Sequence, residues 1–311
     1  MRIIVPIKQV PETNAVKMDE ATGTMIREGV EAIINPLDLY AIEIAIQLRE
    51  SRPEGSTEVI AVSMGPPKAI SALKEAIAMG IDSAVLISDR AFAGSDTWAT
   101  SYVLAAAIRA IGSIGVSPVP GSIGVSPVPG SIGVSPVPSD EAKTQAGSAT
   151  GGTPVLPDLV LCGERATDGD TGQVGPGIAS FLGMPVLTYI GKIEKVSDGT
   201  ARVHRLVEDG YEVLETELPA VLTVVKEIAD PRLPTLRGKQ KAKKADIPTW
   251  GPKDLDVKAE SLGLEGSPTR VVKIFRPKIA RQCEKVIAAD EQAIHKAVDR
   301  VVEFLQKKDL L

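Results

Sequence analysis

The strongest constraint on the fold is an alternation of short apolar runs with amphipathic segments between Arg2 and Leu182. Apolar runs of about five residues are typical of buried strands, and apolar residues at helical spacing are typical of helices that cover a sheet. Strands are predicted at Arg2–Ile7, Glu58–Ser63, Ser83–Ile87 and Asp158–Cys162, and helices at Asp38–Arg49, Pro67–Met79, Asp96–Ile111 and Thr171–Leu182. This alternation predicts an α/β fold with a doubly wound, mostly parallel sheet.

The pattern changes after Pro185, where strands follow one another with short turns. Three strands are predicted at Leu187–Val196, Arg202–Val207 and Tyr211–Leu218, and the turns read SDG and EDG. These strands are expected to add an antiparallel part to the sheet. A Pro-rich, basic stretch follows at Lys226–Trp250 and is expected to form an exposed loop that leads into a short helix. The chain ends in an amphipathic helix predicted at Asp290–Leu310, whose apolar face needs this core or a partner.

One segment departs from the alternation, because the nonapeptide GSIGVSPVP occurs three times in succession from Gly112 to Pro138. Its Gly, Ser and Pro content favours extended, solvated backbone, so a flexible insertion is predicted at about 112–157. A tether or binding segment is an alternative interpretation. The insertion leads from a helix into a strand, which puts it at the amino edge of the sheet, whereas ligands bind at the carboxyl edge.

Charge and composition exclude several classes of function. The net charge is −5, which argues against sequence-independent binding to nucleic acid. The chain has no apolar run of 18 residues, and its first residues carry no basic, cleavable leader, so we expect a cytoplasmic protein without membrane insertion. Cys162 and Cys283 have no CxxC spacing and are expected to be plain thiols, and the two histidines are too few for a zinc cluster or a Cys/His pair.

The segment with the clearest chemistry is Gly163–Pro176, which reads GERATDGDTGQVGP between a strand and a helix. A polar, Gly-rich turn at a helix N-terminus offers free backbone N–H groups, which suit phosphate oxygens. Asp168 and Asp170 are interpreted as helix caps or ribose contacts rather than metal ligands.

Three further turns follow predicted strands at the same edge, namely Ile7–Val10, Met64–Pro67 and Asp89–Thr97. A ligand in the crevice would contact all of them. Asn35 either belongs to a helix-initiating turn with Asp38 as its cap, or bonds an adenine or ribose.

Several of these segments occur together in one known family. The stretches VPIKQVPET, INPLDLYAIEIAIQL, AVSMGPP, SDRAFAGSDTWATS, DGDTGQVGPGIA and RGKQKAKK resemble the beta subunit of electron-transfer flavoproteins, in order and at suitable spacing. Apart from the repeat insertion and the C-terminal tail, the resemblance covers most of the chain. The segment DRAFAGSDT resembles the electron-bifurcating and nitrogen-fixation-associated branch more than the housekeeping branch.

The resemblance implies a Rossmann-like fold and a heterodimer with an alpha subunit that carries its own FAD. Housekeeping members hold AMP in the beta subunit, whereas bifurcating members bind a second FAD there, and this sequence favours FAD. In that case NADH would be the substrate that reduces the FAD. One electron would pass to ferredoxin or flavodoxin, and the other through the alpha-subunit FAD to a dehydrogenase or quinone reductase. The flavin performs the redox chemistry, so no catalytic residue is named.

The resemblance and the turns together give a set of residues predicted to bind the cofactor. They are Ile7, Asn35, Asp38, Met64, Phe92, Asp96, Thr97, Gly163, Ala166, Asp168, Gly169, Asp170, Thr171, Gly172, Gln173, Val174 and Gly175. Phe92, Asp96 and Thr97 are expected beside the flavin, although Asp96 is equally expected as a helix cap.

The basic stretch resembles the family's recognition loop, in which a leucine anchors in the partner dehydrogenase. The residues concerned are Leu236, Arg237, Lys239, Lys241, Lys243 and Lys244. An apolar anchor surrounded by charge suits a transient docking site, and a solvated charged helix is the alternative. The expected organisation is a nucleotide-binding domain at 1–225, with a recognition loop and an arm that packs on the partner subunit at 226–311.

Two other functions remain open from the sequence. A non-bifurcating subunit would bind AMP structurally and relay electrons from an acyl-CoA dehydrogenase. An ATP-binding regulatory module would use a similar sheet but would form a homodimer on its own. A nucleotide-dependent hydrolase or ligase is disfavoured, because the chain has no Walker loop and few histidines.

Overall fold

A computed structural model describes residues 1–12, 32–113, 156–272 and 285–311 of the chain. The described chain forms two compact units, Met1–Val272 and Lys273–Leu311. Most of the predicted repeat insertion lies outside the described residues, and so does Cys283.

The elements alternate through the first unit as the sequence predicts. The strands are β1 Arg2–Pro6, β2 Gln9–Pro11, β3 Ala32–Ile34, β4 Glu58–Met64, β5 Ser83–Ile87, β6 Leu159–Gly163, β7 Val186–Ser197, β8 Thr200–Val207, β9 Gly210–Glu217, β10 Ala220–Val224 and β11 Thr249–Trp250. The α-helices are α1 Asp38–Glu50, α2 Ile70–Met79, α3 Thr97–Ser113, α4 Val174–Leu182, α5 Leu236–Lys244 and α6 Glu291–Gln306. Short 3-10 helices are η1 Pro67–Ala69, η2 Arg90–Phe92, η3 Lys226–Ile228, η4 Pro252–Asp254 and η5 Ala259–Ser261.

The main sheet has nine strands in the order β11-β5-β4-β1-β6-β10-β7-β8-β9. All pairs from β11 to β7 are parallel, and β8 and β9 continue the sheet as an antiparallel hairpin. This confirms the predicted α/β fold with a mostly parallel sheet and antiparallel additions. The strand order reverses beside β1, because β4 and β5 lie on one side of it and β6 on the other, and ligands bind at such a switch point.

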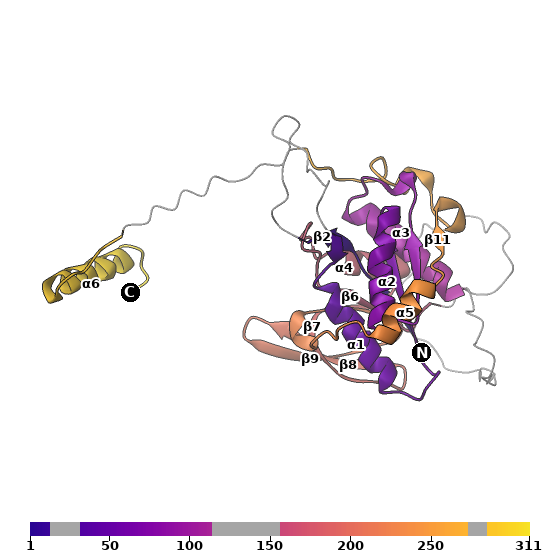
Figure 1. The fold of residues 1–311 in the computed structure, drawn as a ribbon, viewed down its shortest axis with the longest axis horizontal. Coiled ribbons are helices and arrows are strands. Elements are labelled where there is room, and N and C mark those ends of the chain that lie inside the picture. The colour runs from indigo at the N-terminus through magenta and orange to yellow at the C-terminus, as the bar shows by residue number, and fades with distance from the viewer. Residues whose placement is uncertain (13–31, 114–155, 273–284) are drawn as a thin grey trace, which may run out of the picture. The chain divides into compact units, whose positions relative to one another are not determined.

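Helices pack against the parallel strands of the first unit, whose elements Figure 1 labels. The buried apolar residues form two layers, one on each face of these strands. Successive residues of a strand face opposite sides, so Ile3 packs with α1 and α2, and Ile4 packs with α3 and α4. The central strands are buried on both faces, which explains why they read as continuous apolar runs. α5 adds to the first layer by packing against α2.

Some predicted boundaries were wrong, and one central strand was not predicted. The strand that was not predicted is β10, which lies between β6 and β7. Its apolar run AVLTV, directly after Pro219, was a signal that could have identified it. The helix predicted from Thr171 begins at Val174, because the preceding residues form a loop with Gly172 in the left-handed region. α3 continues through Ser113, the second residue of the repeat.

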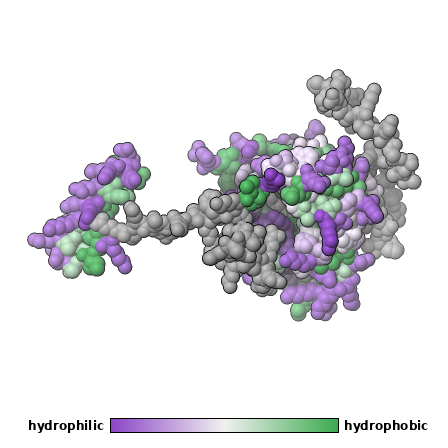
Figure 2. Space-filling model, turned by 90° about the horizontal axis from the view of Figure 1, so that it is seen from above, coloured by the Kyte–Doolittle hydropathy of each residue, from purple (hydrophilic) through white to green (hydrophobic). Residues whose placement is uncertain are grey.

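The second unit contains α6, which Asp290 caps by accepting a hydrogen bond from the Ala293 N–H. Apolar side chains recur along it at helical spacing, and Figure 2 shows them beside strongly polar ones. The exposed apolar residues of this helix are Ile294, Val298, Val301, Val302 and Phe304. Within the described ranges, no helix is long and apolar enough to cross a membrane.

Candidate functional site

A cleft of about 820 Å³ lies at the carboxyl ends of β1, β4, β5 and β6. The loops that follow these four strands line it, and the turns predicted at this edge therefore meet in one place. The longest contributions come from Gly163–Gly175 after β6, here called the phosphate loop, and from Asp89–Thr97 after β5, here called the distal loop.

Most residues predicted to bind a cofactor line this cleft. They are Ile7, Asp38, Met64, Phe92, Asp96, Thr97, Gly163, Ala166, Gly169, Asp170, Thr171, Gly172, Val174 and Gly175. Asn35, Asp168 and Gln173 were also predicted but are not among the lining residues. Three basic side chains that were not predicted, Lys8, Arg90 and Arg165, line the cleft as well. All three lie inside predicted segments, namely Ile7–Val10, Asp89–Thr97 and Gly163–Pro176, and this position was the signal that could have identified them.

At its glycines the phosphate loop presents bare backbone to the cleft, beside Arg165, Asp170 and Thr171. A Cβ added at Gly169 would meet no atom within 4 Å, so this part of the loop faces open space. α4 begins at Val174 without a side-chain cap, which leaves the N–H groups of its first turn free for a ligand. Gly172 has a φ of 63°, a conformation that favours glycine. Together these features form a concave anion site.

The acidic residues of the phosphate loop are engaged in ion pairs. Lys8 Nζ lies 2.7 Å from Asp168 Oδ1, and Arg165 Nε lies 3.2 Å from Asp170 Oδ1. The first pair joins the loop after β1 to the phosphate loop. No group of three potential metal ligands occurs among the described residues.

Two glycines of the phosphate loop are required by close packing behind the cleft. A Cβ at Gly163 would lie 2.5 Å from Asp38 Oδ1 and 2.8 Å from the Leu37 carbonyl oxygen. A Cβ at Gly175 would lie 2.5 Å from Thr223 Cγ2 on β10. These positions bring the phosphate loop directly against α1 and the sheet.

Asn35 is completely buried and holds the phosphate loop from beneath. Its Nδ2 donates to Asp38 Oδ1 and to the Arg165 carbonyl oxygen, both at 2.9 Å. Its Oδ1 accepts a hydrogen bond from the Thr167 N–H at 3.1 Å. Of the two interpretations left open by the sequence, these bonds support the structural one, in which Asn35 fixes a turn.

Asp38 was expected to cap α1, and this expectation was wrong. It is the first residue of the helix, whose N-cap is Leu37, and no side chain caps that end. Asp38 Oδ2 instead accepts a hydrogen bond from the Lys8 N–H at 2.7 Å, so the carboxyl group joins α1 to the loop after β1.

Burial raises the pKa of Asp38 to about 7, although the hydrogen bonds from Asn35 and Lys8 oppose this shift. Cys162, at the end of β6, is also buried, and burial raises the pKa of its thiol well above the usual range. The expectation of a plain thiol is thereby confirmed for Cys162, which is free and buried.

The distal loop is ordered by its own polar residues. Asp89 Oδ1 accepts from the Ala91 N–H at 2.8 Å, and Phe92 is buried in the second apolar layer. Asp96 Oδ1 accepts from the Ala99 N–H at 3.0 Å, so Asp96 caps α3. Thr97 begins that helix and lines the cleft.

The basic stretch forms α5, and Leu236 at its start is 82% exposed. Leu233, which was not predicted, is 84% exposed and lies three residues earlier. Thr235 caps the helix through the Gly238 N–H, and Lys241 Nζ donates to the Ile81 carbonyl oxygen, so this lysine is attached to the core. The remaining predicted docking residues, Arg237, Lys239, Lys243 and Lys244, also belong to α5.

An ion-pair cluster fixes the chain just before α5. Arg232 Nε and N–H donate to Glu43 Oε2 at 2.9 and 3.0 Å, and the guanidinium also bonds Glu50 of the same helix α1. Glu43 is buried, and hydrogen bonds from Arg232 lower its pKa against the opposing effect of burial. The exposed leucines therefore project from a segment that is anchored on α1.

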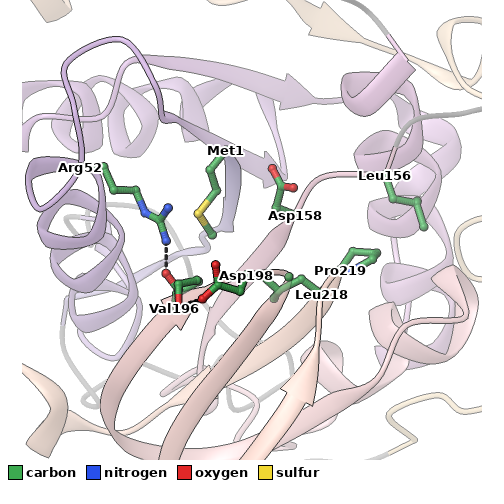
Figure 3. Close-up of a pocket in the computed structure, with 10 residues that line it drawn as sticks. Met1, Arg52, Leu156, Asp158, Val196, Asp198, Leu218 and Pro219 are labelled. Atoms are coloured by element: carbon green, nitrogen blue, oxygen red, sulfur yellow. Dashed lines mark hydrogen bonds between the residues drawn. The ribbon is translucent and has the colours of Figure 1, made fainter. Parts of the chain in front are cut away.

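A second hollow, of about 500 Å³, lies at the opposite, amino edge of the sheet (Figure 3). Met1 and Asp158 border it from the chain before β1 and β6, and Asp198 borders it from the turn after β7. Arg52 points across it and donates to the Val196 carbonyl oxygen. This hollow has no glycine-rich loop at a helix N-terminus, so the cleft at the carboxyl edge is the better nucleotide site.

A glycine-rich loop at a helix N-terminus, placed at the switch point of a parallel sheet, is the arrangement at which α/β proteins commonly bind nucleotides. A family model for the electron transfer flavoprotein domain matches residues 22–118 and 142–255. The chain belongs to the electron transfer flavoprotein family, as a beta-type subunit.

Three relatives illustrate the relationship. The caffeyl-CoA reductase-Etf complex subunit CarD of Acetobacterium woodii is 40% identical over 311 residues, which cover 100% of both chains. The electron transfer flavoprotein subunit beta of Thermoanaerobacterium thermosaccharolyticum is 40% identical over 302 residues, 97% of this chain and 98% of that one. Protein FixA of Azorhizobium caulinodans is 36% identical over 314 residues, 100% of this chain and 96% of that one. These relatives agree with the branch that the sequence motifs resemble.

Proposed function

We propose that this chain binds FAD in the cleft and serves as the beta subunit of an electron-bifurcating electron transfer flavoprotein. The complex would oxidise NADH and divide the two electrons between two acceptors. One acceptor is a ferredoxin or flavodoxin. The other is a dehydrogenase or quinone reductase, reached through the FAD of the alpha subunit.

The observation that carries this proposal is the width of the cleft. The phosphate loop follows β6 and the distal loop follows β5, and β1 and β4 lie between these strands. Three strand spacings of about 4.8 Å place the two loops roughly 14 Å apart. A nucleotide with its phosphates on the phosphate loop therefore needs a further group to reach the distal loop, and the isoalloxazine ring of FAD is such a group.

The residues of the cleft fit a dinucleotide with two phosphates. The bare backbone around Gly169 and the first turn of α4 offer N–H donors. Lys8 and Arg165 supply positive charge beside them, and each is already oriented by an aspartate. Arg90 of the distal loop lines the cleft and has no ion pair within the described residues, so its charge is available to a ligand.

FAD, when bound, supplies the redox chemistry, and this chain binds and orients it. Phe92 and Thr97 border the part of the cleft that would receive the flavin ring. Burial beside the apolar residues of α3 would limit the access of water to that end. We assign no catalytic residue.

Two surfaces suit the partners of such a complex. The apolar face of α6 is exposed in its own unit and would pack on the alpha subunit, as part of the arm within residues 226–311. Leu236 and the charges of α5 would dock the dehydrogenase, since an exposed apolar anchor ringed by charge suits a transient contact. The name of the Acetobacterium relative, a subunit of a reductase-Etf complex, supports a docked redox partner.

Cofactor analysis of the purified heterodimer tests the proposal. Acid release and chromatography should yield two FAD per heterodimer, and one FAD with one AMP would refute the FAD assignment and favour the non-bifurcating alternative. Copurification of this chain as a homodimer with ATP would instead support a regulatory module.

A bulky side chain in the cleft shows which FAD belongs to this subunit. Gly169→Trp places the indole in open space, so one cofactor equivalent should be lost without loss of the fold. Gly169→Ala is the matched control and should retain both. Retention of both equivalents in Gly169→Trp would place the cofactor elsewhere, and loss in both variants would contradict the open space at Gly169.

The docking surface is tested by electron delivery to the dehydrogenase. Leu236→Ala should raise the KM for the dehydrogenase by roughly tenfold or more, which corresponds to the loss of a hot spot. Reduction of the heterodimer by NADH should not change, because Leu236 is not among the residues that line the cleft. An unchanged KM would exclude this leucine as an anchor.

A further inference from the structure

The segment Leu262–Thr269, here called the strap, lies along the distal loop although about 170 residues separate the two in the sequence. Leu262 is buried in the second apolar layer with Phe92. The first unit ends three residues after the strap, at Val272.

Two hydroxyl residues bond the strap to Asp96 at the end of the distal loop. Ser267 Oγ accepts from the Asp96 N–H at 2.8 Å and donates to the Gly263 carbonyl oxygen at 2.6 Å. Asp96 Oδ2 accepts from both the N–H and the Oγ1 hydroxyl of Thr269, at 2.9 and 2.7 Å.

Both oxygens of the Asp96 carboxylate accept hydrogen bonds from the protein itself. Its Oδ1 caps α3 through Ala99, and its Oδ2 holds Thr269. Burial alone would raise the pKa of Asp96, but hydrogen bonds from Ala99 and Thr269 outweigh it and lower the pKa. Asp96 therefore stays ionised and serves to position the distal loop.

The backbones of the strap and the distal loop are also in direct contact. Gly263 has a φ of 58°, and a Cβ there would collide with the Ala91 carbonyl oxygen. A Cβ at Gly94 would lie 3.2 Å from Leu264 Cβ. With so little space between them, a shift of the strap must move the distal loop.

We propose that Ser267 and Thr269 are positioning residues for the far end of the nucleotide cleft, and that they select for a ligand that reaches the distal loop. The inference rests on the proposed function, because it assumes that such a ligand is FAD. Neither residue lines the cleft, so both act through Asp96 and the backbone of the distal loop. The phosphate loop has separate supports in Asn35 and Lys8, and among the described residues it makes no direct hydrogen bond to the strap.

The test measures the affinity of cofactor-depleted heterodimer for FAD and for AMP. The double variant Ser267→Ala/Thr269→Val removes both side-chain bonds and leaves the Thr269 N–H in place. Its affinity for FAD should fall about tenfold, because an unfixed loop must be ordered on binding. Its affinity for AMP, which reaches only the phosphate loop, should stay within about twofold of the wild type.

Two controls separate positioning from general destabilisation. Ser197→Ala/Thr200→Val makes the same chemical changes in the turn between β7 and β8 and should bind both ligands as the wild type does. The single variant Thr269→Ser keeps a hydroxyl at both positions, so its FAD affinity should match that of the wild type.

Each outcome of the test decides the inference. An unchanged FAD affinity in Ser267→Ala/Thr269→Val would overturn it and leave the proposed function intact. An equal loss of FAD and AMP affinity would also overturn it, because the strap would then support the whole fold. A wild-type heterodimer that binds AMP but no FAD in this cleft would refute the proposed function itself, and the inference would fall with it.

Discussion

Asp38 gives a prediction of how stability depends on pH. Its pKa lies at about 7 in the fold, against 3.8 for an ordinary aspartate. Between these two values the folded chain holds a proton that the unfolded chain has released. The stability that this proton contributes is complete below pH 3.8 and is lost as the pH rises through 7, so the nucleotide-free protein should become less stable from pH 5 to pH 8.

The size of the effect follows from the difference in pKa. One pKa unit corresponds to about 1.4 kcal/mol, and the full difference of about three units corresponds to roughly 4 kcal/mol. The part of this free energy that is lost between pH 3.8 and pH 5 falls below the pH range of the measurement. Between pH 5 and pH 8, the loss in free energy of unfolding should be on the order of 2–3 kcal/mol.

Urea unfolding of the wild type and of Asp38→Asn at several pH values isolates this contribution. Asparagine has nearly the same shape and does not titrate, and all other groups are common to both proteins. Both are compared in the same assembly and at the same concentration. The substitution adds a constant cost, because one carboxyl oxygen that accepts from Asn35 or Lys8 becomes an N–H donor. The difference between the two unfolding free energies should change with pH by the amount above, and a difference that stays constant from pH 5 to pH 8 would refute the elevated pKa.

Three further predictions concern packing, ion pairing and reactivity. Gly163→Ala should lower the free energy of unfolding by roughly 2 kcal/mol in urea titrations, whereas Gly169→Ala, whose Cβ has open space, should change it little; equal effects would contradict the packing described. Arg232→Met should cost roughly 3 kcal/mol because it leaves buried Glu43 unpaired, and a cost within the range of an exposed ion pair would show that Glu43 is solvated. With the second cysteine replaced by serine, Cys162 should resist iodoacetamide in the folded protein and react in urea, and rapid alkylation of the folded protein would contradict its burial.

The position of the cleft could be predicted from the sequence, because apolar runs identify parallel strands and the loops after them must meet at one edge. Ile7, Met64 and Gly163 were found in this way, and all three line the cleft. Their roles in binding remain predictions. β10 was not predicted, because only Pro219 separates its five-residue run from the strand predicted at Tyr211–Leu218, and the run was assigned to no element.

The supports behind the cleft could not be predicted in the same way. Asn35 bonds Arg165 and Thr167 across about 130 residues, and Thr269 bonds Asp96 across 173. A polar residue beside a helix start has local partners in most folds, so local rules assigned Asp38 to a cap. Only the tertiary arrangement shows that it bonds the loop after β1 instead.

The two halves of the cleft are therefore held in place by different sets of hydrogen bonds. Asn35 and Asp38 hold the phosphate loop from α1 and the loop after β1, while the strap holds the distal loop from the end of the first unit. The first half contains what any adenine nucleotide needs, namely backbone donors and a helix N-terminus. The second half matters only to a ligand that extends beyond the phosphates. In a fold built this way, we expect a change of cofactor between AMP and FAD to need changes mainly in the distal loop and the strap, because among the described residues no hydrogen bond or ion pair joins the phosphate loop directly to either.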